Sequence, residues 1–403
     1  MENREKAEGP LAGLTVIEMG TLIAGPFCGQ ILGDFGATVI KLEDPGKGDP
    51  MRQWGRSLPK GHSPWWPVIG RNKRSVTLNL RDPDGQAIAR RLIAGADVLV
   101  ENFRPGALEK WGLGYEALSA ENPRLVMARV SGFGQTGPYA QRAGYALIGE
   151  AMGGLRYITG EPDRAPARAG ISIGDSLAGL NAALGVMMAI HARERTGRGQ
   201  VVDAAIYESV LSVMENLITE YGLTGYVRER SGAVLPGIAP SNAYPTKDGA
   251  LVVIGANQDT LFARLCEAMQ RPELAHDPRY AGHAARGQNQ AELDGLIADW
   301  TATLDAEALL DLMRTHGVAA GRVYTAPDML DDPQFTARDA IVETPHPVFG
   351  SVKMQNAFPR LSETPGAVRW PGPGLGEHTD VVLTERAGVD PAALADLRAR
   401  GII

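Results

Sequence analysis

The residue best placed for chemistry is Asp175, which stands beside Gly174 at the predicted start of a helix. The segment reads Gly170-Ile-Ser-Ile-Gly-Asp-Ser-Leu-Ala-Gly179 and leads into an almost wholly apolar run. A carboxylate just before a helix meets free backbone N–H groups and the positive end of the helix dipole. In most chains such a residue is only an N-cap. In a partly dry cleft, however, an ionised carboxylate is also a nucleophile.

A glycine-rich segment offers a second candidate site. Gly132-Phe-Gly-Gln-Thr-Gly137 matches the G-x-G-x-x-G pattern and follows a predicted strand, which raises the hypothesis of an NAD site. Against it, the segment falls late in the α/β region, and Pro138 follows the last glycine. A dinucleotide site would also have an acidic residue at the end of a strand about 20 positions further on, and no such strand-terminal residue is predicted here. A glycine turn that shapes a cleft is therefore favoured over NAD binding.

Basic, amide and aromatic residues gather at the ends of neighbouring predicted strands. In open α/β sheets ligands bind at one strand edge, where cations hold phosphates and an aromatic ring stacks on a base. Each residue taken singly could equally be a solvated surface group. The residues concerned are Asn72-Lys-Arg-Ser75, Arg81, Asn102-Phe-Arg104 and Lys110. A separate loop with Trp54 and Trp65-Trp66 adds aromatic rings. His378 lies in a predicted turn, Gly-Glu-His-Thr, of the kind found in binding sites.

The elements that must position these residues alternate between strand and helix over the first 210 positions or so. This alternation predicts an α/β domain with a parallel sheet. Strands are predicted at 14–18, 38–42, 75–80, 97–100, 125–130 and 200–206, and helices at 26–36, 83–94, 108–121 and 208–225, with another after Asp175.

The polar segment Tyr226–Pro245 is rich in Gly and Pro turns and predicts a domain boundary. A smaller unit follows over about 246–330. It has a predicted strand at 250–255 and predicted helices at 260–269, 290–302 and 306–316. The chain from Glu343 onward is predicted to be turn-rich.

Composition narrows the classes of partner. The 403 residues are 44% hydrophobic and 22% charged, with a net charge of −7, which disfavours nucleic acid and anionic membranes as partners. A polyanionic ligand would need a local cluster of cations. The two cysteines are far apart and indicate a reducing compartment. With a charged start and an apolar run, Leu177–Ile190, that is too short to span a bilayer, we expect a cytoplasmic protein.

Taken together, these segments resemble the class III CoA-transferases, also called the CaiB/BaiF family. The motifs follow one another along essentially the whole chain, which makes them specific for the family but not for its substrate. They are Leu11-Ala-Gly-Leu-Thr-Val-Ile-Glu18, Leu32-Gly-Asp-Phe-Gly-Ala-Thr-Val-Ile-Lys-Leu-Glu43, Asn72-Lys-Arg-Ser75, Val100-Glu-Asn-Phe-Arg-Pro-Gly106, Gly132-Phe-Gly-Gln-Thr-Gly-Pro138, Gly174-Asp175, Thr196-Gly-Arg-Gly-Gln200 and Gly376-Glu-His-Thr379.

The resemblance implies a Rossmann-like α/β large domain built from both termini, residues 1–227 and 331–403, and a smaller α+β domain at 228–330. It implies a homodimer of two interlocked chains. It also implies an enzyme that moves CoA from an acyl-CoA to a carboxylic acid, with CoA as substrate, no tightly bound cofactor and no metal.

The resemblance also assigns roles to single residues. The family's nucleophile falls on Asp175, an active-site tyrosine falls on Tyr145, and Gly174 and Gly179 would let substrate approach the backbone closely. A basic CoA-binding position of the family falls on Asp44, which puts that contact in doubt. The CoA-contacting positions fall on Leu78, Asn79, Arg81, Asn102, Phe103 and Lys110, and the substrate pocket on Ile23, Trp54 and Tyr145.

Departures from the family pattern bear on substrate. The oxalate-using branch has Gln where this chain has Ile23 and Glu where it has Ala146, which disfavours oxalate. The racemases carry His at the position of Tyr145, which disfavours racemisation. The chain looks more like members that use succinyl-CoA and dicarboxylates. A racemase or isomerase, an NAD enzyme and a non-catalytic CoA-binding protein remain as alternatives.

Overall fold

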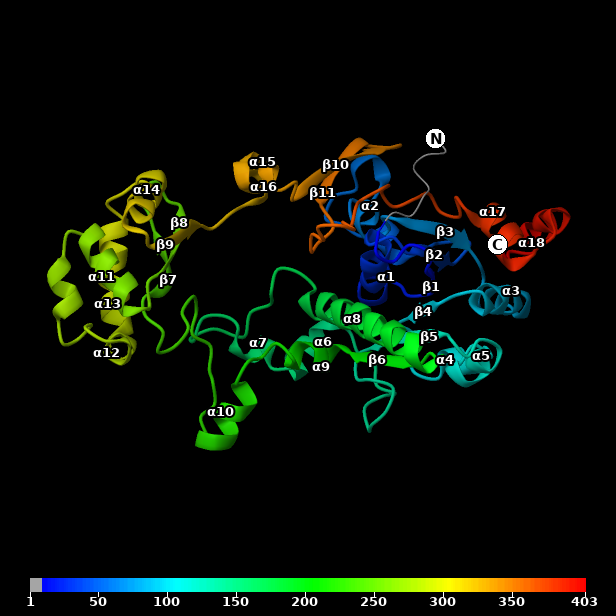
Figure 1. Ribbon diagram of the computed structural model, residues 1–403, viewed down its shortest axis with the longest axis horizontal. Coiled ribbons are helices and arrows are strands. Elements are labelled where there is room, and N and C mark those ends of the chain that lie inside the picture. The colour runs from blue at the N-terminus through cyan, green and yellow to red at the C-terminus, as the bar shows by residue number, and fades with distance from the viewer. Residues whose placement is uncertain (1–8) are drawn as a thin grey trace. The chain divides into compact units, whose positions relative to one another are not determined.

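The computed structural model describes residues 9–403, and a parallel sheet of six strands is the frame of its larger part (Figure 1). The strand order is β3-β2-β1-β4-β5-β6. The predicted α/β class and parallel sheet are confirmed. The strands are β1 (Thr15–Glu18), β2 (Thr38–Glu43), β3 (Lys73–Thr77), β4 (Val98–Glu101), β5 (Val126–Ser131) and β6 (Val201–Ala205).

The strand order reverses between β1 and β4, and this reversal makes a crevice outside the carboxyl ends of the two strands. Both strands are buried along their whole length. Neighbouring residues face opposite sides, so Val16 and Val98 belong to one core cluster while Ile17 and Leu99 belong to the other. Helices therefore cover both faces, as expected of a parallel sheet.

The face that holds Val16 packs against α1 (Ala24–Asp34) and α8 (Ile173–Thr196). The face that holds Ile17 packs against α3 (Pro83–Ala94) and the C-terminal α17 (Thr379–Ala387), which lie side by side in Figure 1. Of the described helices, α8 alone is long and apolar enough to span a membrane. Its alanines at 178, 182 and 189 are buried in the cluster with α1 and the sheet, so α8 is a core helix.

The chain divides into two compact units. The larger comprises the residues up to Leu155, Ala169–Leu217 and Ala337–Ile403, and the smaller comprises Arg156–Arg168 and Ile218–Thr336. These junctions lie some residues away from the predicted junctions after 227 and 330. The smaller unit holds the antiparallel strands β7 (Ser241–Pro245), β8 (Leu251–Gly255) and β9 (Ala319–Arg322), with α11 (Asp259–Ala268), α12 (His283–Gln288), α13 (Gln290–Thr301), α14 (Ala306–His316) and α15 (Ala326–Asp331).

The remaining helices are short. They are α2 (Trp66–Ile69), α4 (Ala107–Lys110), α5 (Tyr115–Glu121), α6 (Ala146–Met152), α7 (Leu155–Ile158), α9 (Ile206–Leu211), α10 (Leu217–Thr224), α16 (Pro333–Ala337) and α18 (Leu394–Ala399). Two predicted long helices, at 108–121 and 208–225, are thus each broken in two. The breaks coincide with residues of positive φ, Gly112 at 68° and Glu215 at 51°, where a right-handed helix cannot continue.

The C-terminal segment corrects the prediction of a turn-rich chain after Glu343. It contains an antiparallel hairpin, β10 (Ile341–His346) and β11 (Gly350–Gln355), that forms a two-stranded sheet of its own. Pro345 concealed β10, but a proline is tolerated where a strand lies at a sheet edge. The last residues return to the main sheet, where the Ile402 carbonyl accepts a 2.8 Å hydrogen bond from the Asn79 N–H.

Ionised side chains are buried beneath α1 at the carboxyl ends of β1 and β2. Lys41 Nζ lies 2.9 Å from Glu18 Oε1 and 2.8 Å from Asp49 Oδ2, and Lys73 Nζ lies 2.7 Å from Glu18 Oε2. The four side chains are at most 1% exposed, and their formal charges cancel. Burial lowers the pKa of Lys41, but the carboxylates of Asp49 and Glu18 outweigh burial and raise it.

The helix above this charge cluster must come unusually close to it. A Cβ at Gly29 in α1 would lie 1.8 Å from Glu18 Oε2, so only glycine fits there. Lys73 also donates to the Pro26 carbonyl at 2.6 Å, and Lys41 to the Gly20 carbonyl at 2.7 Å. The buried lysines therefore hold the turn between β1 and α1 as well as neutralising the carboxylates.

We predict that Lys41→Met destabilises the larger unit by about 3–5 kcal/mol, because it leaves buried carboxylates without their cation. Chemical denaturation followed by circular dichroism measures the change. The matched control is Arg90→Met, which breaks the exposed pair with Glu121 and should leave stability almost unchanged. Equal stability of Lys41→Met and wild type would show that the cluster does not hold the fold.

Candidate active site

Two adjoining cavities open at the point where the strand order reverses. Their linings share Thr21, from the loop after β1, and Phe103, from the loop after β4. Both loops follow the carboxyl ends of their strands, which is where open α/β sheets bind ligands. The chain therefore places two cavities with a shared wall at this edge of the sheet.

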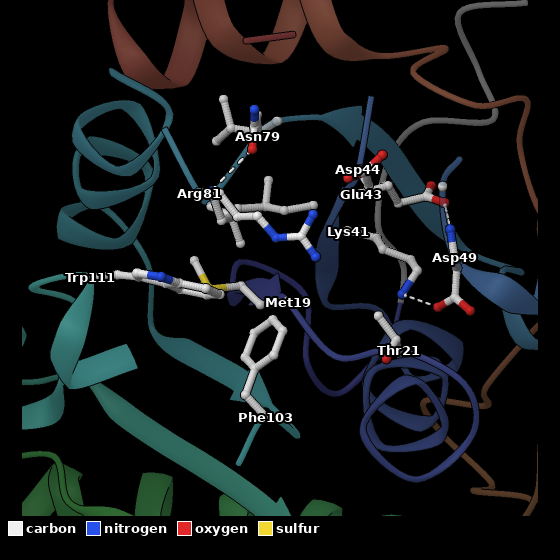
Figure 2. Close-up of a pocket in the computed structure, with 14 residues that line it drawn as sticks. Met19, Thr21, Lys41, Glu43, Asp44, Asp49, Asn79, Arg81, Phe103 and Trp111 are labelled. Atoms are coloured by element: carbon white, nitrogen blue, oxygen red, sulfur yellow. Dashed lines mark hydrogen bonds and ion pairs between the residues drawn. The ribbon is translucent and has the colours of Figure 1, made fainter. Parts of the chain in front are cut away.

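The first cavity has a volume of about 160 Å³ and is drawn in Figure 2. Phe103 and Trp111 form one wall, with their rings edge to face and their centroids 5.3 Å apart. The Arg81 side chain extends into the view above Phe103. No carboxylate within the described chain is paired with its guanidinium, and the residue is exposed. Aromatic rings beside a free guanidinium suit a base attached to phosphates.

Acidic residues line the opposite side of the first cavity, but most of their charge is already neutralised. Arg52 donates two hydrogen bonds of 2.8 Å to the Glu43 carboxylate, and Lys41 pairs with Asp49. Burial raises the pKa of Glu43, but Arg52 and Lys41 outweigh it and hold the pKa below its usual range. Asp44 lines this side as well, and its carboxylate accepts from the N–H groups of Gly46 and Lys47.

The second cavity has a volume of about 220 Å³ and contains the candidate nucleophile. Asp175 and Tyr145 line it together with Ile23, so the structure brings these three predicted residues to one place. Tyr145 is 65% exposed and immediately precedes α6, whereas Ile23 is buried. Two arginines, Arg104 and Arg142, line the same cavity.

Asp175 lies within the first turn of α8, which begins at Ile173 after Ser172, so the prediction that it precedes the helix is wrong. The Asp175 carboxylate is still close to the positive end of the helix, because the free N–H groups extend over the whole first turn. The carboxylate of Glu150, which is 2% exposed on α6, accepts a 3.4 Å hydrogen bond from the Gly174 N–H. That contact fixes the start of α8 against α6.

The two glycines expected to admit substrate are packing positions in this structure. A Cβ at Gly174 would lie 3.1 Å from Ile206 and 3.2 Å from the Ala146 carbonyl. A Cβ at Gly179 would lie 2.7 Å from the Ala24 carbonyl in α1. Both therefore let helices approach one another, and this close approach sets the position of Asp175.

The loop between the two cavities is held on both sides. The Asn102 side chain accepts from the Thr21 N–H and donates to the Thr21 carbonyl, each at 2.8 Å. Asp49 accepts from the N–H of Leu22, a non-glycine residue with a φ of 66°. A strained backbone conformation of this kind persists only where its surroundings impose it. The walls of both cavities thus depend on Asn102 and on the charge cluster beneath α1.

The other predicted contact residues are distributed unevenly. The first cavity is lined by Leu78, Asn79, Arg81 and Phe103, and the second by Asn102 and again Phe103. Lys110, exposed at the end of α4, lines neither, although the next residue, Trp111, lines the first. Trp54 is 45% exposed and also lines neither.

Sequence reasoning missed several lining residues, among them Met19, Thr21, Trp111 and Arg142. Trp111 had a usable signal, because it follows Lys110 directly. Arg142 had a weaker one, its place three positions before Tyr145. The cysteines need no role in the site, since burial raises the pKa of each thiol to about 12 and keeps it protonated.

The glycine-rich segment does not have the form of a dinucleotide turn. Its last glycine does not open a helix, and α6 begins only at Ala146. A Cβ at Gly132 would lie 2.7 Å from the Cα of Gly144, and the Gln135 N–H donates to Asp203. The segment is a folded turn, and Gly132 lines the second cavity. The interpretation as a turn that shapes a cleft is thereby favoured.

Comparison with known proteins agrees with this geometry. The sequence signature of CoA-transferase family III matches residues 11–379. The chain is 59% identical over 394 residues to succinyl-CoA–D-citramalate CoA-transferase of Chloroflexus aurantiacus, covering 98% of each. It is 37% identical to succinate–glutarate CoA-transferase of Agrobacterium fabrum, covering 98% of this chain and 99% of that one.

Solved structures agree as well. A CaiB/BaiF family protein from Brucella suis superposes with a TM-score of 0.84 at 37% identity, over 94% of this chain and 99% of that one. The chain therefore belongs to CoA-transferase family III, the CaiB/BaiF family, and the predicted family is confirmed. It is a CoA-transferase, so the expectation of an enzyme is confirmed and that of a non-catalytic CoA-binding protein is set aside.

Proposed function

We propose that this CoA-transferase carries CoA from succinyl-CoA, or a similar dicarboxylic acyl-CoA, to a second dicarboxylate, with Asp175 as the nucleophile. The observation that carries the proposal is the pair of adjoining cavities. One holds Arg81, Phe103 and Trp111, and the other holds Asp175. A single CoA ester laid across the shared wall would have its nucleotide in the first cavity and its thioester in the second.

The nucleotide end suits the first cavity on grounds of charge and shape. Adenine would stack against Phe103, and Arg81 would hold a phosphate in a protein whose net charge is otherwise unfavourable to polyanions. Leu78 and Asn79 complete this wall. Lys110, which precedes Trp111 in the chain and is exposed, remains a proposed second phosphate contact. Asp44 would keep phosphates toward the Arg81 side by repulsion.

The acyl end suits covalent chemistry at Asp175. Its carboxylate would attack the thioester carbonyl and expel CoA thiolate, leaving an aspartyl–acyl anhydride. The thiolate would then attack the aspartyl carbonyl, release the donor acid and form an aspartyl-CoA thioester. The acceptor carboxylate would take the donor's place by the reverse of these steps. Both intermediates hydrolyse readily, so the site must exclude water throughout.

Substrate choice follows from the walls of the second cavity. Ile23 lines this cavity, and Ala146 directly follows the lining residue Tyr145; both are apolar where the oxalate-using branch has polar groups, so the pocket would favour a longer, partly apolar dicarboxylate over oxalate. The relatives named above, which act on D-citramalate and glutarate, support this choice. Tyr145 stands where a racemase has its histidine base, which supports transfer over racemisation. Trp54 remains a proposed pocket residue.

We predict that Asp175→Ala lowers transfer by about 10⁴-fold or more while leaving CoA binding intact, because a covalent nucleophile has no substitute. Transfer from succinyl-CoA to glutarate is measured by mass spectrometry of the CoA products. Hydroxylamine added to wild type with succinyl-CoA should trap a hydroxamate at residue 175. The control is Asp299→Ala, an exposed carboxylate on α13. Near-normal transfer by Asp175→Ala would refute the assignment.

We predict that Arg81→Glu raises the Kd for CoA about 10- to 100-fold, the cost of losing charge-assisted hydrogen bonds. Calorimetry measures binding. The KM for an acyl-pantetheine, which lacks the nucleotide, should not change. Arg386→Glu, an exposed charge reversal on α17, is the matched control. An equal loss of affinity for CoA and for the pantetheine ester would place the nucleotide elsewhere.

We also propose that the working form is a homodimer of interlocked chains, located in the cytoplasm. Its support on this chain is an exposed apolar stripe along α8: Leu180, Leu184 and Met188 are 49%, 54% and 61% exposed at four-residue intervals. Exposed apolar patches of this kind mark protein interfaces. The two buried, free thiols fit a reducing compartment.

We predict a single species of twice the chain mass that persists on dilution until the protein unfolds, because interlocked chains cannot part while folded. Light scattering after size exclusion, over micromolar to nanomolar concentrations, measures it. Leu184→Glu should yield monomers or aggregates by placing a charge in the covered stripe, whereas Arg386→Glu should not. Folded monomers of wild type on dilution would refute interlocking.

A further inference from the structure

The charges that line the second cavity do not balance. Its charged lining consists of the carboxylate of Asp175 and the guanidinium groups of Arg104 and Arg142, which gives a net formal charge of +1. Neither arginine has a carboxylate partner in the described part of the chain. A cavity with a surplus cation and a single nucleophilic carboxylate is suited to a ligand that brings an anion of its own.

The two arginines differ in where they stand. Arg104 follows Phe103, which lines both cavities, but Arg104 itself lines only the second. Arg142 belongs to the segment that leads into α6, and Ala143, Gly144 and Tyr145 of that segment line the cavity with it. The start of α6 packs against Gly174, the neighbour of Asp175. Arg142 is therefore carried by the structure that also fixes the nucleophile.

The Arg142 guanidinium is also held in place before any ligand arrives. It lies over the ring of Tyr139, with its central carbon 3.7 Å from the ring centroid. Stacking of this kind restricts the side chain while leaving its N–H groups free to donate. A planar guanidinium with free donors binds a carboxylate through two parallel hydrogen bonds. Lysine at this position could not reproduce either the stacking or the paired bonds.

We infer that Arg142 is the specificity-determining residue that binds the distal carboxylate of the dicarboxylic acyl group, the one that does not react. This inference rests on the proposed function, because it takes Asp175 as the reacting centre. A dicarboxylate would then lie with one carboxyl at Asp175 and the other at Arg142. A monocarboxylate of equal length would leave the arginine without a partner.

The test compares two acceptors that differ only at the distal end, glutarate and its monoamide. Both react with the same CoA-loaded enzyme, so the ratio of their kcat/KM values is independent of the donor. We expect wild type to prefer glutarate by about 10- to 100-fold, the worth of a charge-assisted pair. In Arg142→Gln the ratio should fall to about one, since glutamine bonds an amide as well as a carboxylate.

Further variants separate this role from a structural one. Arg142→Lys should recover only part of the preference, Tyr139→Leu should weaken it by freeing the guanidinium, and Arg386→Gln should leave it unchanged. A preference preserved in Arg142→Gln, or lost only in Arg104→Gln, would overturn the inference. Failure of the proposed function would be seen separately, as wild type that transfers CoA to neither acceptor.

Discussion

The ion pairs of Lys41 with Glu18 and Asp49, and of Lys73 with Glu18, are the interaction on which the rest of the larger unit depends. Four fully buried charges are tolerated only because they cancel and because each is also hydrogen-bonded or paired at short range. In cancelling, they tie β1, β2 and β3 together beneath α1 and hold the carbonyl groups of Gly20 and Pro26. The loop that forms the wall between the two cavities is thus anchored from below by charge and from the side by Asn102.

That anchoring explains why the site lies where it does. The strand order reverses between β1 and β4, and the loops that follow these strands diverge, which opens a crevice. Helix α8 packs on the same face of the sheet as α1, and α6 packs against α8. The approach of α8 to α1 through Gly179, and of α6 to α8 through Gly174, brings Asp175 and Arg142 to the same cavity. The two glycines therefore contribute to the site indirectly. They allow the helices to pack closely, and this packing sets the positions of Asp175 and Arg142.

Much of the fold could be predicted because its signals are local. Every strand of the main sheet was predicted within a few residues, since each is a short segment between turn signals and all but β6 are buried along most of their length. One error arose where a distant segment intervenes. Residues 78–80 were predicted as strand, but β3 ends at Thr77. The Asn79 N–H instead donates a hydrogen bond to the carbonyl of Ile402, in the returning C-terminal segment. The hairpin after residue 340 went unrecognised because Pro345 interrupts the strand pattern of β10. For the site, Asp175, Tyr145, Ile23, Arg81 and Phe103 line the two cavities, whereas Lys110 and Trp54 do not, because adjacency in a motif says nothing about the direction of a side chain.

By itself the sequence determined the class of the sheet, the family and the residue best suited to act as nucleophile, because these depend on residue types and their order along the chain. Only the tertiary structure decided that the aromatic pair Phe103 and Trp111 lies beside Arg81 and that Arg142 shares a cavity with Asp175. It also decided that Lys41 is buried in ion pairs that hold the loop between the two cavities. Those relations join residues tens of positions apart. They exist only once helices have packed on the sheet at distances set by side-chain volume, and no local pattern encodes such distances.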